Sequence, residues 1–422
     1  MRIDLFRMER TQCLYENEVE FNLSESGVLP MTVGEILGPE TDTRALHDLR
    51  LKYPASRGSE TLRDRIAGFY GDATRDNVMV TNGGSEANYV VFWGLLDQGD
   101  RAAVMIPNYL QAWGLARAYG GRADPFRLIE RRTNGRRRWA LDVQGLDRAV
   151  TRRTKIILVT NPNNPTGAVL DEDEMEAVVR AARRVGAWIV SDEVYRGAEV
   201  EGEISPTFWG RYDKVLVTAG LSKAFGLPGL RTGWILGPAR TLAHLCRYHD
   251  YLTLTPTFLS DRLAEIVMEP RRREAILART RGLIRKNIPV LERWIGAHGD
   301  TLTYIRPVAG AIALVGYRLP IGSEALFTKL RREQSVLITP GSHFGIGRYI
   351  RIGYGYDADH LGRGLERIDA TLADLERGRD RLSVPLKGIP PMRVAVKRIA
   401  AKRAGVKRGP ATRRGPRATA GR

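Results

Sequence analysis

Lys223 is the residue whose type and position point most directly to chemistry. It follows a predicted buried strand, in the glycine-rich segment Ser222–Trp234. Lysine is seldom buried without a partner, but an amine that forms a Schiff base suits such a position, because removal from water lowers its pKa and makes it nucleophilic. Arg231, eight residues later, carries a fork-shaped guanidinium that suits a phosphate. Taken separately, these two residues could also be an ordinary loop lysine and arginine.

A second candidate is the segment Thr81–Ala87, which is typical of a strand, a glycine turn and the start of a helix. Free backbone N–H groups at a helix N-terminus bind phosphate groups. We therefore expect Gly84 and Ser85 to hold a phosphate. Many turns between a strand and a helix have this composition, so the segment alone is a weak signal.

The surrounding elements that must position these segments are predicted to form a doubly wound sheet. Apolar, β-branched runs alternate with amphipathic helical patterns over the first two-thirds of the chain. The predicted strands are 77–81, 102–106, 155–160, 187–191 and 214–218. This alternation favours a mostly parallel sheet, in which ligands lie at the carboxyl ends of the strands. Each candidate segment above follows such an end.

Helical patterns and a change of pattern near residue 260 complete the expected architecture. The helix predicted at 171–185 has Asp171 at its N-cap, acidic residues in its first turn and Gly186 just beyond its end. After residue 260 come a long basic helix at 271–295, short strands at 311–317 and 350–353, and a final helix at 359–377. This second pattern predicts a smaller α+β domain. The first forty residues look irregular, and we expect them to form an arm.

Length and composition exclude several classes of protein. A chain of 422 residues suffices for two globular domains with a substantial interior. No run of eighteen apolar residues is present, and the first residues lack the apolar segment of a secretory signal, so we expect no membrane span and no secretion. Two cysteines are too few for a disulfide framework, which favours a reduced, cytoplasmic setting. No metal site is predicted.

The positive charge is concentrated at the C-terminal end. Residues 382–422 contain twelve lysines and arginines and no acidic residue, so the rest of the chain accounts for only +6 of the net charge of +18. This stretch has few large apolar side chains and cannot offset the entropy of ordering, so we expect a disordered tail. It could bind polyanions weakly through phosphate contacts, and the alternative is a solubilising extension.

Considered together, the motifs resemble the class I and II aminotransferases, which depend on pyridoxal phosphate (PLP). The lysine segment is similar to the lysine motif of that family, Asn161–Gly167 to its NPxNPTG turn, Ser191–Tyr195 to its DxxY motif, and Tyr349–Gly353 to its carboxylate-binding segment. The resemblance covers about residues 20–375, with the motifs in the family's order. It implies the aspartate-aminotransferase-like α/β fold (fold type I), with a mostly parallel seven-stranded central sheet in a large domain and a smaller α+β domain.

The resemblance and the composition together give expected domain boundaries. They are an N-terminal arm at 1–45, a large PLP-binding domain at 46–258, a small C-terminal domain at 259–380 and the basic disordered tail at 381–422.

The resemblance also implies catalytic roles. Lys223 would hold PLP as a Schiff base and, once released, remove the proton from the substrate Cα. Asp192 would pair with the pyridine nitrogen and keep it protonated, which makes the ring an electron sink and would lower the pKa of Asp192 itself. Tyr195 and Asn164 would hydrogen-bond the phenolic oxygen of PLP. Seen alone, Asp192 could be a turn or N-cap residue, Asn164 a turn residue and Tyr195 a packed aromatic.

For the rest of the cofactor the resemblance implies a phosphate site and a stacking residue. The implied phosphate ligands are Gly84, Ser85, Ser222, Arg231 and, from the neighbouring subunit of a homodimer with shared active sites, Tyr53. Tyr109 would stack on the pyridine ring, with core packing as its alternative. In one departure from the family, Gly220 stands where many members have a phosphate-binding serine.

For the substrate, the resemblance implies that Arg351 clamps the α-carboxylate with two hydrogen bonds. The backbone of Gly27 and the amide of Asn164 would lie near the same carboxylate. A surface arginine is the alternative for Arg351.

These expectations predict a PLP-dependent aminotransferase that transfers the amino group of an L-α-amino acid to a 2-oxo acid. A narrower resemblance, in 23–28, 220–223, 250–254 and 340–345, is to the branch containing capreomycidine synthase, which cyclises a hydroxylated arginine without net amino transfer. A PLP-dependent cyclase, lyase or oxidase of an arginine-type amino acid is therefore the alternative. Glu25 could then receive a guanidinium, unless it merely faces solvent. A PLP-fold transcription regulator, which would carry a helix-turn-helix domain ahead of this fold, is a remote alternative.

Overall fold

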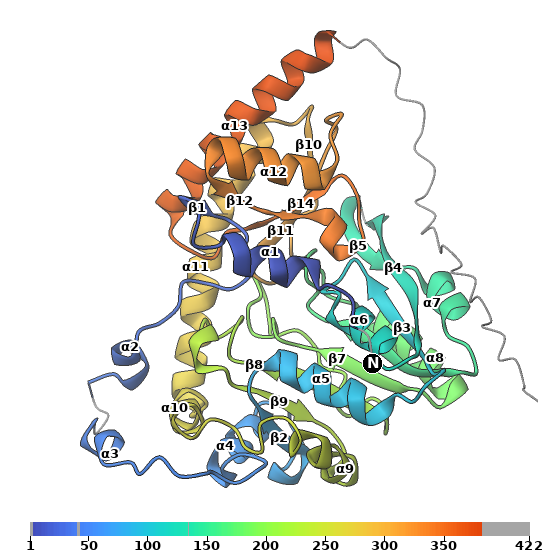
Figure 1. The fold of residues 1–422 in the computed structure, drawn as a ribbon, viewed down its shortest axis with the longest axis vertical. Coiled ribbons are helices and arrows are strands. Elements are labelled where there is room, and N and C mark those ends of the chain that lie inside the picture. The colour runs from blue at the N-terminus through green and yellow to red at the C-terminus, as the bar shows by residue number, and fades with distance from the viewer. Residues whose placement is uncertain (1–2, 40–42, 134, 382–422) are drawn as a thin grey trace, which may run out of the picture. The chain divides into compact units, whose positions relative to one another are not determined.

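Strands from the middle of the chain form one large sheet in the computed structural model, which describes residues 3–39, 43–133 and 135–381 (Figure 1). Among these residues the sheet has eight strands, in the order β2-β9-β8-β7-β6-β3-β4-β5. The strands are β2 (Val78–Thr81), β3 (Arg101–Ile106), β4 (Arg122–Thr133), β5 (Arg136–Leu141), β6 (Thr154–Thr160), β7 (Trp188–Asp192), β8 (Val215–Gly220) and β9 (Gly233–Leu236). Neighbours from β8 through β7, β6 and β3 to β4 are parallel, which confirms the predicted mostly parallel α/β sheet.

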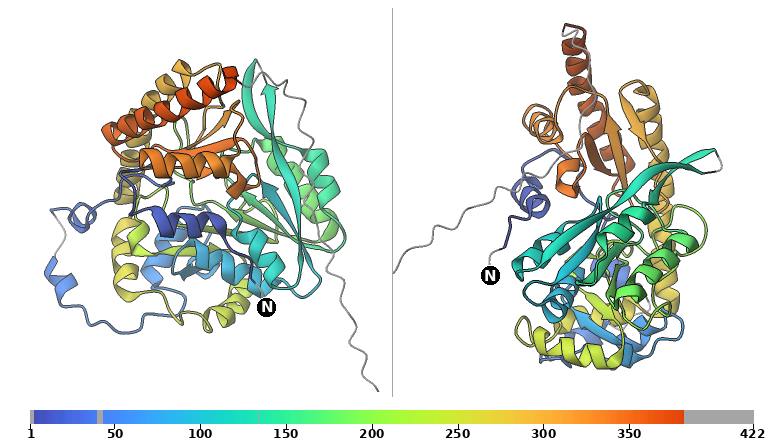
Figure 2. Two further views of the ribbon diagram at one scale, coloured as in Figure 1. Left: turned by 45° about the horizontal axis from the view of Figure 1, so that its top comes forward. Right: turned by 90° about the vertical axis from the view of Figure 1, so that its right-hand side faces the viewer.

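The strand count differs from the seven that we expected, because β5 adds an eighth. Its residues pair antiparallel with the outer half of β4, from Leu128 to Thr133. The resulting two-stranded ribbon projects beyond the rest of the sheet, as the right view of Figure 2 shows. The antiparallel strand β9 lies between β2 and β8.

Helices cover both faces of this sheet, because its strands bury apolar side chains on both sides. On one face lie α5 (Gly84–Leu95), α6 (Gln111–Ala118) and α9 (Ala239–His249), whose apolar residues, such as Phe92 and Leu115, pack with Val104 and Ile235. On the other face lie α4 (Glu60–Ala67), α7 (Val143–Ala149) and α8 (Glu172–Val185). The carboxyl ends of the parallel strands are left to form a site.

The helix α8 illustrates how the sequence sets the ends of an element. The Asp171 side chain accepts from the backbone N–H of Glu174, and the Glu174 side chain accepts from the backbone N–H of Asp171, so the predicted N-cap is part of a capping box. At the other end, Gly186 adopts a left-handed conformation with φ of 70°, which glycine accepts without steric cost. The predicted helix boundaries are confirmed.

A second, four-stranded antiparallel sheet forms in the C-terminal third, in the order β10-β11-β14-β13. Its strands are β10 (Leu302–Tyr304), β11 (Ile312–Tyr317), β13 (Thr339–Pro340) and β14 (Tyr349–Gly353). The helices of this region are α10 (Phe258–Val267), α11 (Pro270–Ala297), α12 (Ser323–Gln334) and α13 (Ala358–Arg381). The predicted smaller α+β region is therefore present.

The N-terminal arm is more regular than we expected. It contains α1 (Arg7–Tyr15), β1 (Phe21–Asn22), α2 (Val33–Leu37) and α3 (Thr43–His47). The short strand β1 pairs in parallel with β12 (Val336–Leu337), so the arm joins elements of the C-terminal third. Figures 1 and 2 show α1, in dark blue, between that region and the large sheet.

Residues up to Arg381 form one unit by their contacts, and the division into domains at residues 46, 259 and 381 stays a prediction. The predicted tail lies outside the described residues apart from Arg381, the last residue of α13. None of the described helices is long and apolar enough to cross a membrane.

Candidate active site

A cavity of about 290 Å³ lies at the carboxyl ends of the parallel strands. Strand β7 ends at Asp192, β8 leads into the loop that carries Lys223, and β2 leads into the glycine turn before α5. Nine of the residues predicted for the site line this cavity: Gly84, Ser85, Tyr109, Asn164, Asp192, Tyr195, Ser222, Lys223 and Arg231. The structure thus brings together residues that are up to 147 positions apart in the chain.

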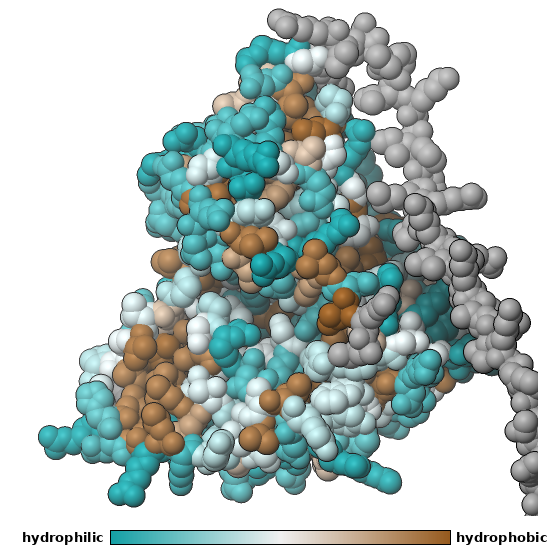
Figure 3. Space-filling model, viewed as in Figure 1, coloured by the Kyte–Doolittle hydropathy of each residue, from teal (hydrophilic) through white to brown (hydrophobic). Residues whose placement is uncertain are grey.

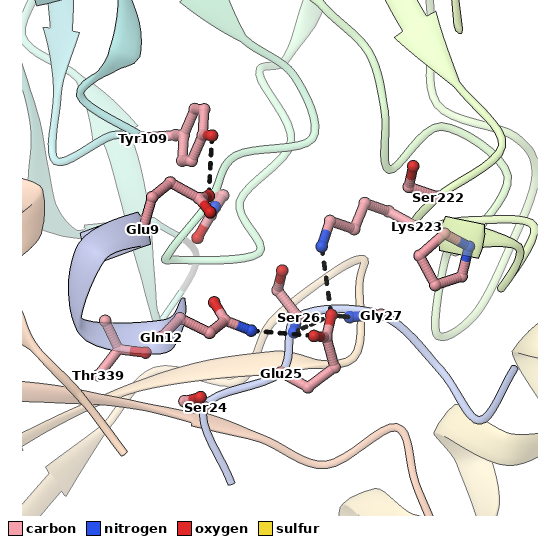
Figure 4. Close-up of polar contacts among 12 residues, drawn as sticks. Glu9, Gln12, Ser24, Glu25, Ser26, Gly27, Tyr109, Ser222, Lys223 and Thr339 are labelled. Carbon is pink, nitrogen blue, oxygen red and sulfur yellow. Dashed lines mark hydrogen bonds and ion pairs between the residues drawn. The ribbon is translucent and has the colours of Figure 1, made fainter. Parts of the chain in front are cut away.

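Lys223 points into the cavity and forms an ion pair with Glu25 (Figure 4). The Lys223 Nζ lies 3.2 Å from the Glu25 Oε1. Burial is the largest single effect and lowers the pKa of Lys223, but the interactions with Glu25 and Tyr195 together outweigh it, so the pKa is raised. The expected lowering of this pKa is therefore wrong. The ion pair also lowers the pKa of Glu25 to about 2.

Glu25 is held in the cavity by three further hydrogen bonds. Its Oε1 accepts from the backbone N–H groups of Ser26, at 2.9 Å, and Gly27, at 3.0 Å, and its Oε2 accepts from the Gln12 side chain at 3.0 Å. The alternative that Glu25 merely faces solvent is wrong, because its carboxylate lines the cavity.

Sequence reasoning missed three residues of α1 that line the cavity: Met8, Glu9 and Gln12. The Tyr109 hydroxyl donates to the Glu9 carboxylate at 2.8 Å (Figure 4). The Phe6 ring packs edge-on against the Tyr109 ring, with the centroids 4.7 Å apart. They were missed because we expected the arm to be irregular. The arm therefore supplies two carboxylates, those of Glu9 and Glu25, to the site.

Asp192 is buried at the end of β7, and two groups hydrogen-bond its carboxylate. The Asn88 amide donates to Oδ2 at 3.3 Å, and the backbone N–H of Val194 donates to Oδ1 at 3.3 Å. Burial raises the pKa of Asp192 to about 6. Asn88 also lines the cavity, and sequence reasoning missed it as well.

Tyr195 and Asn164 line the same cavity as this carboxylate. Among the residues that the structure describes, the buried Tyr195 hydroxyl makes no hydrogen bond of ordinary geometry, although the Ser26 side chain is a polar neighbour. Because buried hydroxyl groups are normally hydrogen-bonded, an unpartnered one that lines a cavity indicates a place for a ligand's polar atom. The Asn164 Oδ1 accepts from Arg351 at 3.0 Å, which leaves its amide nitrogen for a ligand.

The glycine turn before α5 forms a cradle for an anion. Gly83 is the N-cap residue, and no side chain caps the first N–H groups of the helix. Arg231 lies against this turn: a side chain at Gly83 would put its Cβ 2.6 Å from the Arg231 Nη2. The Arg231 Nη1 lies 3.4 Å from the Ser222 hydroxyl. A helix N-terminus, a guanidinium and hydroxyl groups together suit a phosphate.

The departure at Gly220 has a local reason. This last residue of β8 packs so closely against β9 that a Cβ would lie 2.9 Å from the Thr232 carbonyl oxygen and 3.2 Å from the Gly233 Cα. A serine would not fit without movement of the backbone. The polar side chains that line this part of the cavity are instead those of Ser222, Ser85 and Arg231.

Arg351, Gly27 and Tyr53 do not line the cavity. Arg351 is fully buried behind Asn164, and its Nη groups also donate to the Ser24 carbonyl and the Thr339 hydroxyl. Its Nε has no partner in the described part of the chain. The Gly27 backbone N–H donates a hydrogen bond to the Glu25 carboxylate. Tyr53 is 79% exposed, so its predicted part in a neighbouring subunit's site is not tested by a single chain.

The described residues fit PLP. The anion cradle suits its phosphate, the unpartnered Tyr195 hydroxyl suits a ring oxygen, and Asp192 suits a protonated ring nitrogen. Lys223 supplies the amine that would react with its aldehyde.

Comparisons with known proteins agree. The sequence profile of the family "Aminotransferase class I and II" matches residues 21–368. Capreomycidine synthase of Streptomyces vinaceus is 32% identical over 372 residues, which cover 86% of this chain and 92% of that protein. Arginine–pyruvate transaminase of Pseudomonas aeruginosa is 30% identical, covering 76% of this chain and 83% of that protein. The crystal structure of a PLP-dependent aminotransferase from Streptococcus suis matches with a TM-score of 0.82 at 28% identity, covering 89% of this chain and 99% of that chain. This chain belongs to the class I and II aminotransferases and is a PLP-dependent enzyme.

Proposed function

We propose that the protein transfers the amino group of an L-α-amino acid to a 2-oxo acid, with Lys223 as the residue that bonds PLP and moves the proton at the substrate Cα. The observation that carries this proposal is the position of the Lys223 amine, in one cavity with an anion cradle, a buried carboxylate and an unpartnered phenol.

Six side chains of the cavity then have a task in holding the cofactor. Ser85, Ser222 and Arg231 bind its phosphate, and Asp192 holds a proton on its ring nitrogen. Tyr195 and Asn164 bind its ring oxygen. Once bound, PLP supplies an aldehyde that reacts with amines and a ring that accepts electrons from Cα.

Lys223 must be neutral to accept a proton from Cα. The ion pair with Glu25 opposes this, because it raises the pKa of Lys223. A group that draws the Glu25 carboxylate away from the amine, such as a cation on the substrate, therefore assists the proton transfer. Arg351 would orient the substrate by its α-carboxylate. Because it does not line the cavity, this role requires Arg351 to exchange its hydrogen bond to Asn164 for one to the substrate.

The experiment is a half-reaction. The PLP-loaded protein is mixed with one L-amino acid at a time, without a 2-oxo acid, while its absorbance is followed. An aminotransferase converts the cofactor once to its amino form and stops, and an added 2-oxo acid restores the starting spectrum. Steady turnover of any amino acid without an oxo acid would remove the transaminase assignment.

A second candidate, a cyclase, lyase or oxidase of an arginine-type amino acid, is favoured by the charges that line the cavity. With Arg231 on the phosphate, Asp192 on the ring nitrogen and Lys223 bonded to the cofactor, Glu9 and Glu25 are lining carboxylates without a cation. A substrate with a guanidinium would neutralise them, because guanidinium and carboxylate pair with two parallel hydrogen bonds. Arginine–pyruvate transaminase, one of the relatives named above, acts by its name on an amino acid with a guanidinium.

Substrate charge and reaction type are tested separately. Arginine is compared with citrulline, which has nearly the same shape without the charge. We expect kcat/KM to be about a hundredfold higher for arginine, because citrulline would lose roughly two charged hydrogen bonds to the carboxylates. Glu25→Gln should reduce this preference. Equal values for both amino acids would contradict a cationic substrate. Oxygen uptake recorded during the half-reaction separates an oxidase from a cyclase, because only the oxidase consumes oxygen.

We further propose a homodimer in which Tyr53 reaches the phosphate site of the neighbouring subunit. Tyr53 and Tyr251 are 79% and 84% exposed, and Leu51, Leu254 and Leu259 are exposed as well. Figure 3 shows an apolar patch over α10, the helix that carries Leu259. Exposed apolar surface of this kind is typical of an interface.

Mixed dimers test this arrangement. A Tyr53→Ala chain and a Lys223→Ala chain, each with low activity alone, are unfolded, mixed and refolded. In a shared site the mixed dimer has one complete site, so an equal mixture should recover about a quarter of wild-type activity. A monomer in sedimentation velocity, or no recovery on mixing, would contradict the shared site.

A cytoplasmic location is part of the proposal, supported by the absence of a disulfide between the two cysteines, Cys13 and Cys246.

A further inference from the structure

Asn88 occupies a position from which it touches both the cofactor cavity and the strands beneath it. It lies one turn into α5, is 5% exposed and lines the cavity. Below it, Asp192 of β7 and Thr218 of β8 are directly paired in the parallel sheet, so their side chains point to the same face. Asn88 contacts both of them.

The hydrogen bonds of Asn88 fix the direction of its amide. The Thr218 hydroxyl donates to the Asn88 Oδ1 at 2.7 Å, which turns Nδ2 towards Asp192. The second N–H of Nδ2 faces the Gln111 Oε1 at 3.3 Å. With the amide reversed, its oxygen would face an ionised carboxylate, acceptor against acceptor.

The Asp192 carboxylate depends on this amide. Among the described residues its hydrogen bonds come from Asn88 and the backbone of Val194. A buried carboxylate with few donors tends to take up a proton, and burial already raises the pKa of Asp192 to about 6, while the Asn88 bond opposes that rise. An Asp192 that is itself protonated could not hold a proton on a ring nitrogen.

We propose that Asn88 is a positioning residue that keeps Asp192 ionised and directed at the cofactor ring nitrogen, and that Thr218 sets the orientation of the Asn88 amide. This inference rests on the proposed role of Asp192 in cofactor binding. It adds a chain of three side chains, Thr218, Asn88 and Asp192, which runs from the sheet to the cavity.

The test measures cofactor binding rather than turnover. Apoproteins are titrated with PLP and with 1-deaza-PLP, in which a carbon atom replaces the ring nitrogen, and dissociation constants are taken from the absorbance. Asn88→Leu keeps the side-chain volume and removes the amide. It should weaken PLP binding about tenfold, the loss expected for one buried hydrogen bond to a charged group, and leave 1-deaza-PLP binding within twofold. Thr218→Val should weaken PLP binding in the same direction by a smaller factor.

Two controls separate positioning from general packing. Gln111→Leu also breaks a bond of Asn88, but Gln111 donates to the Ser85 carbonyl at 2.8 Å, so any effect should be equal for both compounds. In wild type, the preference for PLP over 1-deaza-PLP should disappear as falling pH protonates Asp192, and Asn88→Leu should move that midpoint to higher pH.

Equal weakening of both compounds by Asn88→Leu, or none, would overturn the inference. Circular dichroism shows whether the variants fold. If Asn88→Leu does not fold, the same comparison of PLP with 1-deaza-PLP is made with Thr218→Val, whose side chain has nearly the same shape as threonine. The proposed function fails differently: a wild-type protein without any preference for PLP, unaffected by Asp192→Asn, would remove Asp192 from the site. A preference that Asp192→Asn abolishes and Asn88→Leu leaves intact would remove Asn88 alone.

Discussion

At the scale of single residues, the ion pair between Glu25 and Lys223 is a main feature of the cavity. The ion pair raises the pKa of Lys223 against the effect of burial. The lysine, the aspartate and the phosphate cradle could be predicted from motif spacing, because each lies at a strand end. Asn88 could have been found as well, since it lies four residues after Gly84 on the same face of a helix. The ion pair could not, because its partners are 198 positions apart.

The first prediction concerns Glu25→Gln. Removing the ion pair lets burial lower the pKa of Lys223, so more of the amine is neutral near pH 7. Covalent attachment of PLP to the apoprotein should then be faster, about tenfold for each unit by which the pKa falls. The advantage should shrink as the pH rises towards the wild-type pKa, where both amines are neutral. Stopped-flow absorbance measures the rate. Glu9→Gln, which removes the same charge without touching Lys223, should change it little; equal rates for wild type and Glu25→Gln would contradict the account.

The second prediction concerns Asp192→Asn. Without the charge the ring nitrogen loses its partner, and kcat should fall on the order of 10³-fold or more, about 4 kcal/mol. Burial raises the pKa of Asp192 to about 6, so in the apoprotein its charge destabilises the fold above that pH. Asp192→Asn should therefore unfold at a higher temperature than wild type at pH 8, with the difference vanishing as the pH falls through 6 towards 4. Near-normal turnover would remove Asp192 from the mechanism.

At the scale of elements, five strands of the large sheet could be predicted, and three of its strands, β4, β5 and β9, could not. In β4, Pro125 argues against a strand, because it cannot donate to a ladder. The structure accommodates it because β5 begins to pair only at Leu128, so Pro125 lies where β4 is still an edge. Strand β9 is four residues long and merges with the lysine segment. Helix α1 has nine residues and buries only Met8, so tertiary contacts rather than its own pattern stabilise it.

The third prediction concerns those contacts of α1. The Tyr15 ring packs on Phe327, with centroids 6.1 Å apart, and under the Arg331 guanidinium at 4.0 Å. Tyr15→Ala removes both contacts, which together contribute about 1–2 kcal/mol of interaction free energy. The loss should loosen α1, whose residues line the cavity. KM for the amino acid should rise several-fold while the affinity for PLP stays the same. Tyr15→Phe keeps the ring and should behave as wild type; an unchanged KM in Tyr15→Ala would show that α1 does not contribute to substrate binding.

At the scale of the whole molecule, the sequence distinguishes the C-terminal tail from the rest of the chain, but it does not show how the arm and the C-terminal third come together. Charge and composition mark residues 382–422, whereas the arm reaches the C-terminal third through the pairing of β1 with β12. A division of the chain into continuous domains cannot represent this contact, because it joins residues more than 300 positions apart.

The fourth prediction concerns deletion of residues 382–422. The cavity-lining residues all precede this stretch, so kcat and KM should stay nearly unchanged. Twelve positive charges are lost, so retention on a heparin column should decrease, and the retention of the full chain should fall as salt rises. An inactive truncated protein would mean that the tail is needed by the folded part.

The central claim is that Lys223 is the residue that bonds the cofactor. The direct measurement is borohydride reduction of the PLP-loaded protein, followed by digestion and mass spectrometry of the peptides. The account predicts a pyridoxyl phosphate group on the peptide that contains Lys223, and none anywhere in Lys223→Ala treated in the same way. A stoichiometric label on another lysine in wild type, or a label that persists in Lys223→Ala, would contradict it.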